Sequence, residues 1–183
     1  MAQFFDQLEP AHVAFVGAQP LFFVATSAVN ARISLSPKGI DSFRVLAPDR
    51  VGYLDLTGSG NETAAHLQQD GRITLMFCSF SSKPLILRIY GRGRAVAPAD
   101  GEFAQLSTAF PQIVGLRQLI VVDVSSVQTS CGYGVPRMDF VAQRDTLLRW
   151  AEKKGEDGLR AYRQANNRRS IDGAAVRLPD PAE

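Results

Sequence analysis

Apolar residues in this chain recur mostly with the short period of β-strands, and a few stretches show helical spacing instead. Several runs are dense in β-branched and aromatic residues, a composition typical of strands. We expect strands at residues 21–29, 32–35, 43–46, 51–56, 72–80, 85–96 and 119–124, the last running on toward 128. Helical spacing predicts helices over residues 4–16, 60–69, 100–110, 145–154 and 158–167.

Short helices placed irregularly among many strands favour an antiparallel barrel over a sandwich, whose strands are usually joined by plain turns. The same irregularity argues against a doubly wound sheet, in which strands and helices alternate. We therefore expect a mainly β (α+β) fold in which residues 1–142 form a barrel domain. Residues 143–183 are expected to form a helical C-terminal extension that ends in a loose tail from Val176 onward. In this extension, Arg160, Arg163, Arg168 and Arg169 are expected to form a solvated face.

A glycine-rich corner joins the strand predicted at residues 51–56 to the helix that follows it. The sequence Thr57-Gly58-Ser59-Gly60-Asn61 exposes backbone N–H groups beside the positive end of that helix. Lys38 and Arg44 stand shortly before the corner and add full positive charges. This combination predicts a binding site for a phosphorylated cofactor.

The same corner has an interpretation that needs no ligand. Ser59 and Glu62 form an S-x-x-E pattern, in which the serine caps the helix and the glutamate bonds back to it. Helix caps are commoner than phosphate sites. The glycines also match neither the Walker phosphate-binding loop nor the dinucleotide fingerprint. Both interpretations stay open at this point.

The composition excludes several function classes. The formal net charge of +2 is too small to indicate a nucleic-acid partner or an anionic membrane. No apolar run approaches the roughly 18 to 20 residues of a membrane span, and the N-terminus lacks a secretory signal pattern. We therefore expect a cytoplasmic protein. The cysteines, Cys78 and Cys131, and the histidines lack the spacing of a metal site, and Cys78 is expected to be a core residue.

The strand predicted at residues 85–96 has two contrasting faces. Leu85, Leu87 and Ile89 point one way, and Arg88, Tyr90, Arg92 and Arg94 point the other. The basic face is either a solvated surface or a wall that faces an anion or another subunit. In the later loop at residues 129–136, two glycines flank Tyr133, so the backbone can approach a ligand closely or simply turn.

Taken in order, these segments resemble the flavin-binding split-barrel proteins of the pyridoxamine-phosphate-oxidase-like superfamily. The segments that carry the resemblance lie within residues 21–128 and read FFVATSAV, SPKGIDSFRVL, YLDLTGSGNETAAHL, RITLMF and LRIYGRGRAV. The resemblance implies a six-stranded antiparallel split β-barrel with short flanking helices. It also implies a homodimer that binds FMN in clefts between the two barrels. The cofactor contacts that it implies are Lys38, Arg44, Val45, Leu46, Leu56, Thr57, Gly60, Asn61, Glu62, Thr63 and Arg88.

One departure from the family pattern lies at the helix start. Pyridoxamine phosphate oxidases carry an Arg-Lys pair there, whereas this chain has Glu62-Thr63. A carboxylate beside a phosphate is repulsive unless Glu62 turns back into its capping box. Phosphate binding then relies on Lys38, Arg44, Thr63 and backbone N–H groups.

The resemblance implies an FMN-dependent oxidoreductase with a small-molecule substrate, and NADH or NADPH as candidate electron donor. No catalytic residue follows from it, because a bound flavin carries the redox chemistry. A non-catalytic flavin-binding protein is the alternative, and family members that use deazaflavin F420 or haem leave the cofactor open. Tyr133 and Arg137 favour the enzyme if they line a cavity above the flavin ring.

Pyridoxamine 5′-phosphate itself is not expected to be the substrate. The oxidases that this chain resembles recognise that substrate through additional basic residues and a C-terminal segment rich in Trp and Arg. Here Trp150 lies in an amphipathic helix, and Arg177-Leu178-Pro179 lacks an aromatic partner. A site that is missing such hydrogen-bonding partners loses most of its discrimination.

Overall fold

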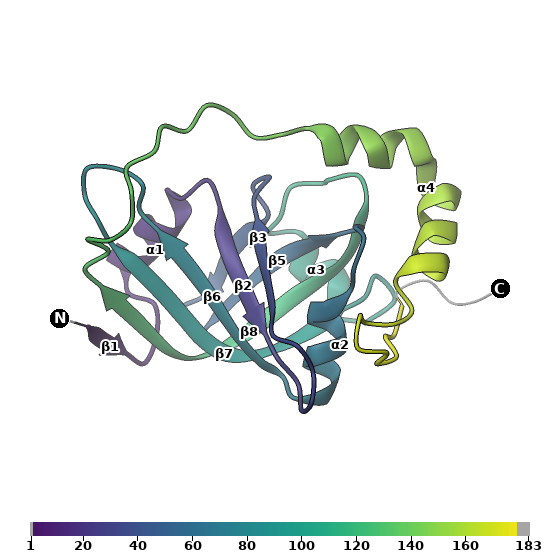
Figure 1. The fold of residues 1–183 in the computed structure, drawn as a ribbon, viewed down its shortest axis with the longest axis horizontal. Coiled ribbons are helices and arrows are strands. Elements are labelled where there is room, and N and C mark those ends of the chain that lie inside the picture. The colour runs from purple at the N-terminus through teal and green to yellow at the C-terminus, as the bar shows by residue number, and fades with distance from the viewer. Residues whose placement is uncertain (1, 179–183) are drawn as a thin grey trace.

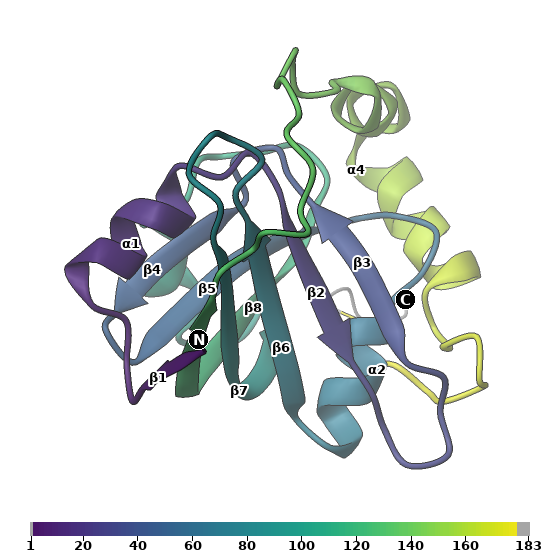
Figure 2. The same ribbon diagram turned by 60° about the vertical axis from the view of Figure 1, so that its left-hand side comes forward.

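The computed structural model describes residues 2–178, and its centre is an antiparallel sheet that curls into a barrel (Figures 1 and 2). The strands are β1 Gln3–Phe5, β2 Phe22–Thr26, β3 Ser34–Lys38, β4 Phe43–Ala47, β5 Arg50–Leu56, β6 Arg72–Cys78, β7 Ile86–Val96 and β8 Leu116–Ser130. Their order in the 8-stranded sheet is β3-β2-β6-β7-β8-β5-β4, and β1 pairs with β8. The predicted mainly β, antiparallel split-barrel fold is confirmed.

The sheet contains more than the six strands expected of the barrel. The seven β-type runs predicted from the sequence all form strands, and the eighth strand is β1, which pairs with residues 127–129 of β8. Most of β1 falls within residues 4–16, for which the sequence predicted a helix. Helix α1 instead spans Pro10–Gly17, so the prediction was wrong for the residues before Pro10. The reason is that proline, which lacks a backbone N–H, suits the first position of a helix.

Strand β5 is buried on both faces, between two apolar clusters. Inside the barrel it packs in a cluster with Phe22, Leu75, Phe77, Leu87, Ile89 and Val127. On its other face, Leu54 packs with Leu119, Val121 and Phe110 under helix α3, which spans Phe103–Ser107. Helix α3 is shorter than the predicted 100–110, because the Asp100 carboxylate accepts the Ala97 N–H at 2.8 Å and does not cap the helix.

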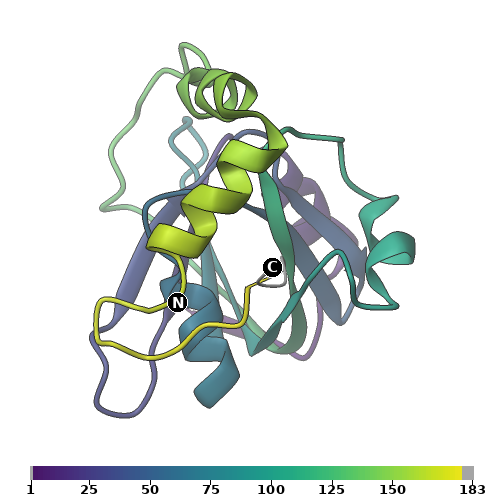
Figure 3. The same cartoon turned by 90° about the vertical axis from the view of Figure 1, so that its right-hand side faces the viewer.

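Two further helices lie at the end of the barrel where β5 finishes. Helix α2 spans Glu62–Gln69, and α4 spans Thr146–Asn166 with a break at Gly155, whose φ is 66°. The break separates the two helices predicted over residues 145–154 and 158–167. Helix α4 crosses this end of the molecule, and a long connection from β8 leads to it over the barrel (Figures 1 and 3).

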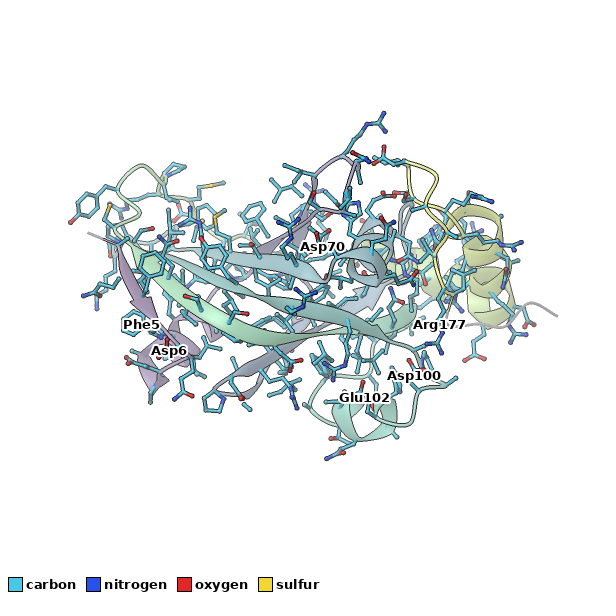
Figure 4. The ribbon with its side chains drawn as sticks, turned by 90° about the horizontal axis from the view of Figure 1, so that it is seen from below. Phe5, Asp6, Asp70, Asp100, Glu102 and Arg177 are labelled. Carbon is cyan, nitrogen blue, oxygen red and sulfur yellow. The ribbon has the colours of Figure 1, made fainter. Side chains whose placement is uncertain are left out.

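The segment after α4 returns along α2 and is partly anchored. Val176 is buried against Ala64 and Ala65 of α2. Arg177 Nη2 lies 2.9 Å from Asp100 Oδ1, and Figure 4 shows the two side chains meeting. The prediction of a loose tail was therefore wrong at Val176, and its part from residue 179 on lies outside the described residues. The domain boundary at residues 142–143 stays a prediction. Across residues 2–178, none of the helices is long and apolar enough to span a membrane.

Candidate functional site

A buried carboxylate, Asp55, organises the polar groups where β5 ends. Asp55 is only 2% exposed. Its Oδ2 accepts hydrogen bonds from Arg117 Nη2 and Gln118 Nε2, both at 2.8 Å. On the other oxygen, Lys38 Nζ lies 3.4 Å from Oδ1. Two cationic side chains thus share this one carboxylate, and the three groups together carry a net positive charge.

The register of β3 explains how Lys38 reaches this position. Lys38 lies opposite Phe22, whose ring belongs to the barrel core. Because side chains alternate along a strand, Lys38 shares the interior face. There its ammonium also lies over the ring of Tyr53, 5.8 Å from the ring centroid.

The buried position changes the titration of two groups. Burial by itself raises the pKa of Asp55, but the charges of Arg117 and Lys38 and the hydrogen bonds from Gln118 and Arg117 outweigh it. The pKa of Asp55 therefore lies below its ordinary value. Burial is the main cause that raises the pKa of Tyr53 well above its ordinary value, and the Asp55 charge adds to it. At neutral pH Asp55 is ionised and Tyr53 is not.

The C-terminal extension closes this corner from outside. Arg163 of α4 is 7% exposed, and its Nη1 donates to Thr57 Oγ1 at 3.1 Å. Asn167 donates to the Gly58 carbonyl at 3.0 Å, and its Oδ1 accepts a bond from Arg117 at 2.9 Å. We expected a solvated face of Arg160, Arg163, Arg168 and Arg169. That prediction was wrong for Arg163, because its guanidinium finds a buried acceptor at the corner.

Helix α2 begins without the predicted capping box. Its N-cap is Asn61, and no side chain caps it. The side-chain oxygen of Asn61 instead accepts a bond from Gln118 Nε2 at 3.2 Å. Both carboxylate oxygens of Glu62 accept the backbone N–H of Ile171, at 3.0 and 3.2 Å. The box between Ser59 and Glu62 was wrong, because the segment after α4 provides a competing donor.

The structure brings most of the predicted corner residues together but leaves little of them exposed. Thr57, Asn61 and Thr63 are buried, Leu56 and Glu62 are half-buried, and Gly60 is exposed. The Gly60 carbonyl accepts a hydrogen bond from Arg117 at 3.0 Å. These groups therefore form a compact polar corner, which we define as Lys38, Asp55, Thr57, Gly58, Gly60, Asn61, Glu62, Thr63, Arg117, Gln118, Arg163 and Asn167.

The predicted residues on β4 lie next to a different feature. Arg44 holds Asp41 with contacts of 2.7 and 2.9 Å, and its Nε donates to the Ala109 carbonyl at 3.0 Å. The hydrogen bond from Arg44 is the main cause that lowers the pKa of Asp41. Arg44 and Val45 line a cavity of about 640 Å³ between α1 and β4. Leu46 packs in the apolar cluster under α3.

Arg88 lies apart from Lys38, on the outer face of the sheet. Its register partners are Met76 and Gln128, and its Nη1 lies 3.4 Å from Ser130 Oγ. Partners within the chain also hold the rest of the predicted basic face. Tyr90 donates to Gln128 at 2.8 Å, Arg92 donates to the Asp70 carbonyl, and Arg94 pairs with Glu102 at 2.8 Å. The alternation predicted for this strand is confirmed.

The glycine-flanked loop contributes little to either feature. Tyr133 is 82% exposed, and Arg137 borders a separate cavity with Phe80 and Phe140. Cys131 is exposed, while Cys78 is buried as predicted, and burial raises the pKa of its thiol. Among the residues that the structure describes, no three His, Cys, Asp or Glu side chains gather to hold a metal ion.

Sequence reasoning missed Asp55, Arg117, Gln118 and Asn167. A usable signal was the Arg117-Gln118 pair directly before the apolar run 119–122, where both side chains turn out to be buried. A buried charge requires a partner, and Asp55 stands at the end of another apolar run. Asn167 gives no such signal, because its role depends on how the extension docks.

The family model for pyridoxamine 5′-phosphate oxidase matches residues 8–131, which run from before α1 through the end of β8. The chain belongs to the pyridoxamine 5′-phosphate oxidase family. A curated family member, the pyridoxamine 5′-phosphate oxidase family protein ustO of Aspergillus flavus, is 39% identical over 175 residues. That alignment covers 85% of this chain and 70% of the relative.

Solved structures of distant proteins share the barrel. A candidate pyridoxamine 5′-phosphate oxidase of Lactobacillus delbrueckii matches with a TM-score of 0.56 and 17% identity, over 67% of this chain and 94% of that one. A single-residue variant of HupZ from Group A Streptococcus matches with a TM-score of 0.55 and 16% identity, over 67% and 98% of the two chains. At these identities the likeness is one of fold alone.

Proposed function

We propose that this protein is an FMN-dependent oxidoreductase that acts on a small molecule. Membership of the pyridoxamine 5′-phosphate oxidase family supports the flavin. The observation that carries the proposal is the excess of positive charge in the polar corner, where Lys38 and Arg117 share one carboxylate. The anionic phosphate of FMN is the partner that such an excess favours.

Two observations bear on whether the residues fit this cofactor. The start of α2 has no side-chain cap, so its positive end suits a phosphate. Glu62, whose charge opposes a phosphate, is drawn toward the Ile171 N–H. The residues fit, and we assign the phosphate to Lys38, Thr63 and the first turn of α2. We assign the remaining contacts with FMN to Leu56, Thr57, Gly60 and Asn61 at the corner and to Arg44, Val45 and Leu46 on β4.

The protein's own part in the chemistry is binding and orientation. A bound flavin supplies hydride transfer, which requires no protein acid, base or nucleophile. Arg163 bonds to the Thr57 hydroxyl and Asn167 to the Gly58 carbonyl from outside, which keeps the corner in one geometry and excludes water. A cytoplasmic location belongs to the proposal and rests on the composition.

The absorbance spectrum of the purified protein and a fluorescence titration with FMN test the proposal. We expect a yellow preparation, or uptake of one FMN per chain. Lys38→Met should weaken FMN binding by roughly ten- to a hundred-and-fifty-fold, because it removes a charge-assisted hydrogen bond worth about 1.5 to 3 kcal/mol. A colourless protein that binds no FMN contradicts the proposal, and titrations with deazaflavin and haem are then the next step.

A surface arginine gives the matched control for that titration. Arg169 lies in the exposed segment after α4, and its Nη1 donates to the Gly173 carbonyl. Arg169→Ala should leave FMN affinity unchanged. If Lys38→Met and Arg169→Ala bind FMN alike, the phosphate has been assigned to the wrong residues.

We further propose a homodimer formed through the outer face of the sheet. Arg88 and Tyr90 lie on that face, and the register places the half-buried Phe23 and Met76 and the exposed Phe4 in the row of Arg88. A two-fold interface uses such a patch twice. Tyr90→Asp should loosen the dimer and lower flavin occupancy, as measured by light scattering and absorbance. Tyr133→Asp, in an exposed loop, is the control, and a monomer with full flavin occupancy contradicts this part.

Pyridoxamine 5′-phosphate is not the substrate that we propose. Trp150 packs edge-on against Tyr162 with the ring centroids 5.0 Å apart, and Arg177 pairs with Asp100, so both are engaged structurally. Pro179, which completes the Arg177-Leu178-Pro179 sequence, lies outside the described residues. Steady-state oxidation of pyridoxamine 5′-phosphate at ordinary enzymatic rates would overturn this statement. Anaerobic mixing of the flavin-loaded protein with NADH or NADPH tests the donor. Absence of flavin reduction by either supports the non-catalytic alternative.

A further inference from the structure

The cavity of about 640 Å³ between α1 and β4 has an aromatic wall. Figure 2 shows α1 lying alongside β4. Phe22, Phe43 and Phe77 all line the cavity, and their rings contact one another with centroid distances of 4.9 to 5.4 Å. Such a volume falls within the range of small-molecule sites, roughly 300 to 1,000 Å³. Aromatic walls of this kind favour flat ring systems through edge-to-face and offset contacts.

The charged and amide groups of the lining are already engaged. Asp41 and Arg44 form an ion pair with each other. The Gln143 amide donates to the Pro20 carbonyl at 2.7 Å and accepts the Ile40 N–H at 3.2 Å. A charged ligand would have to break the ion pair, so the cavity favours an uncharged one.

Ser42 is the exception among these polar groups. It lines the cavity and is 4% exposed, and its hydroxyl has no hydrogen-bond partner within the described part of the chain. An unsatisfied buried hydroxyl is costly, and a ligand that pairs with it removes that cost. A ligand that reaches this buried hydroxyl therefore gains one hydrogen bond beside the phenylalanine wall.

The rim of the cavity is held in an unusual conformation. Ile40 and Asp41 have φ angles of 58° and 50°, a left-handed region that is sterically unfavourable for a β-branched residue such as Ile40. The hydrogen bond between Ile40 and Gln143 ties this turn to the connection that leads to α4. Strained backbone of this kind concentrates at ligand sites.

We infer that this cavity binds an uncharged aromatic molecule with one hydrogen-bonding group, which packs on the phenylalanine wall and bonds to Ser42. Assigning the molecule as the substrate rests on the proposed function, because Arg44 and Val45 of the same lining are proposed flavin contacts. The binding site itself does not depend on the flavin.

Fluorescence titration of the full-length protein with 2-naphthol tests the inference, and naphthalene serves as the probe without a hydroxyl. We expect one saturable site for 2-naphthol. Ser42→Ala should weaken 2-naphthol binding by roughly 2- to 12-fold, the range for one neutral hydrogen bond, and leave naphthalene binding unchanged. Equal losses for the two probes would contradict the assigned role of Ser42.

A pair of glycine substitutions separates the cavity from the rest of the surface. Gly17 lines the cavity, and a Cβ added there meets nothing within 4 Å. Gly17→Phe should fill the space and weaken both probes at least about tenfold, the equivalent of roughly 1.4 kcal/mol. Gly101 is equally open and lies outside the lining, so Gly101→Phe is the control. If both variants bind the probes as the unchanged protein does, the inference fails.

Adding FMN to the same titrations separates this inference from the proposed function. Binding of 2-naphthol by a protein that takes up no FMN supports the inference and contradicts the flavin. If the protein binds FMN but not 2-naphthol, the inference is contradicted and the proposed flavin binding is supported. Displacement of 2-naphthol by FMN overturns the inference, because the cavity is then the cofactor site.

Discussion

The polar corner and the aromatic cavity share the turn at residues 39–41, which follows Lys38 of the corner and contributes Gly39 and Asp41 to the cavity lining. The two features differ in how their polar groups are paired. In the corner, Asp55, Arg117 and Asn167 are buried and bonded to one another. In the cavity, phenylalanine rings form one wall, and the Ser42 hydroxyl has no partner among the described residues.

The difference separates a buried network that stabilises the fold from a cavity that has room for an aromatic ligand. Polar groups that hydrogen-bond to one another in a buried network stabilise the fold, and removing one of them leaves the others without partners. An apolar space with one unsatisfied polar group gains from an occupant. Substitutions in the buried network of Asp55, Arg117 and Asn167 should therefore change the free energy of unfolding, and substitutions in the cavity should change the binding of an aromatic ligand.

The largest effect is expected for Arg117→Ala. It leaves the buried Asp55 carboxylate with Lys38 as its one cationic partner among the described residues, beside the hydrogen bond from Gln118, and breaking a buried ion pair typically costs about 3 to 5 kcal/mol. Urea unfolding measures this. Arg149→Ala breaks a pair with side chains 69% and 64% exposed, and it should change stability by about 0 to 1 kcal/mol. Similar losses in the two variants would contradict the central place of the corner in folding.

The ion pair between Asp55 and Arg117 should also make the free energy of unfolding depend on pH. The loss of stability at acidic pH should be no larger than the loss caused by Arg117→Ala. Because the pKa of Asp55 is lowered in the folded protein, its contribution is fully present above the unfolded value of about 3.9. It is lost as the pH falls through the lower folded value. Urea unfolding at a series of acidic pH values should show this decline in the unchanged protein. A decline of the same size in Asp55→Asn would exclude Asp55 as its source.

Asn167→Ala should cost less, about 1 to 3 kcal/mol, because it leaves polar groups of the corner without their partners. Amide exchange should also become faster in the segment after α4. Its neighbour Asn166 is exposed and donates to the Tyr162 carbonyl within the same helix, so Asn166→Ala is the matched control. Equal protection of these amides from exchange in the two variants would mean that contacts other than those of Asn167 anchor the extension.

The smallest effect concerns the cofactor. Glu62→Ala removes a negative charge from the first turn of α2, where a charge is typically worth about 0.3 to 1 kcal/mol. FMN should then bind roughly 2- to 5-fold more tightly in a fluorescence titration. Glu152→Ala, exposed on α4, should have no effect. Weaker FMN binding in Glu62→Ala would contradict the phosphate assignment.

Much of the fold could be predicted from the sequence, because its strands carry dense apolar and β-branched runs. The short β1 has no such run and is a strand only because β8 extends far enough to pair with it. The glycines pointed to the corner, but the capping box predicted there was wrong, since Glu62 bonds to Ile171, which is distant in sequence. The cavity had no motif at all, because Phe22, Phe43 and Phe77 come together only through the barrel.

The most direct test of the distinction between the two regions is a titration of FMN into the protein saturated with 2-naphthol. The account predicts that both bind at once, each with the affinity that it has alone or with a modest change. The flavin then occupies the corner and β4 while the aromatic probe occupies the cavity beside it. Mutual exclusion, in which FMN releases 2-naphthol in proportion to its own binding, would contradict the separation of the two sites.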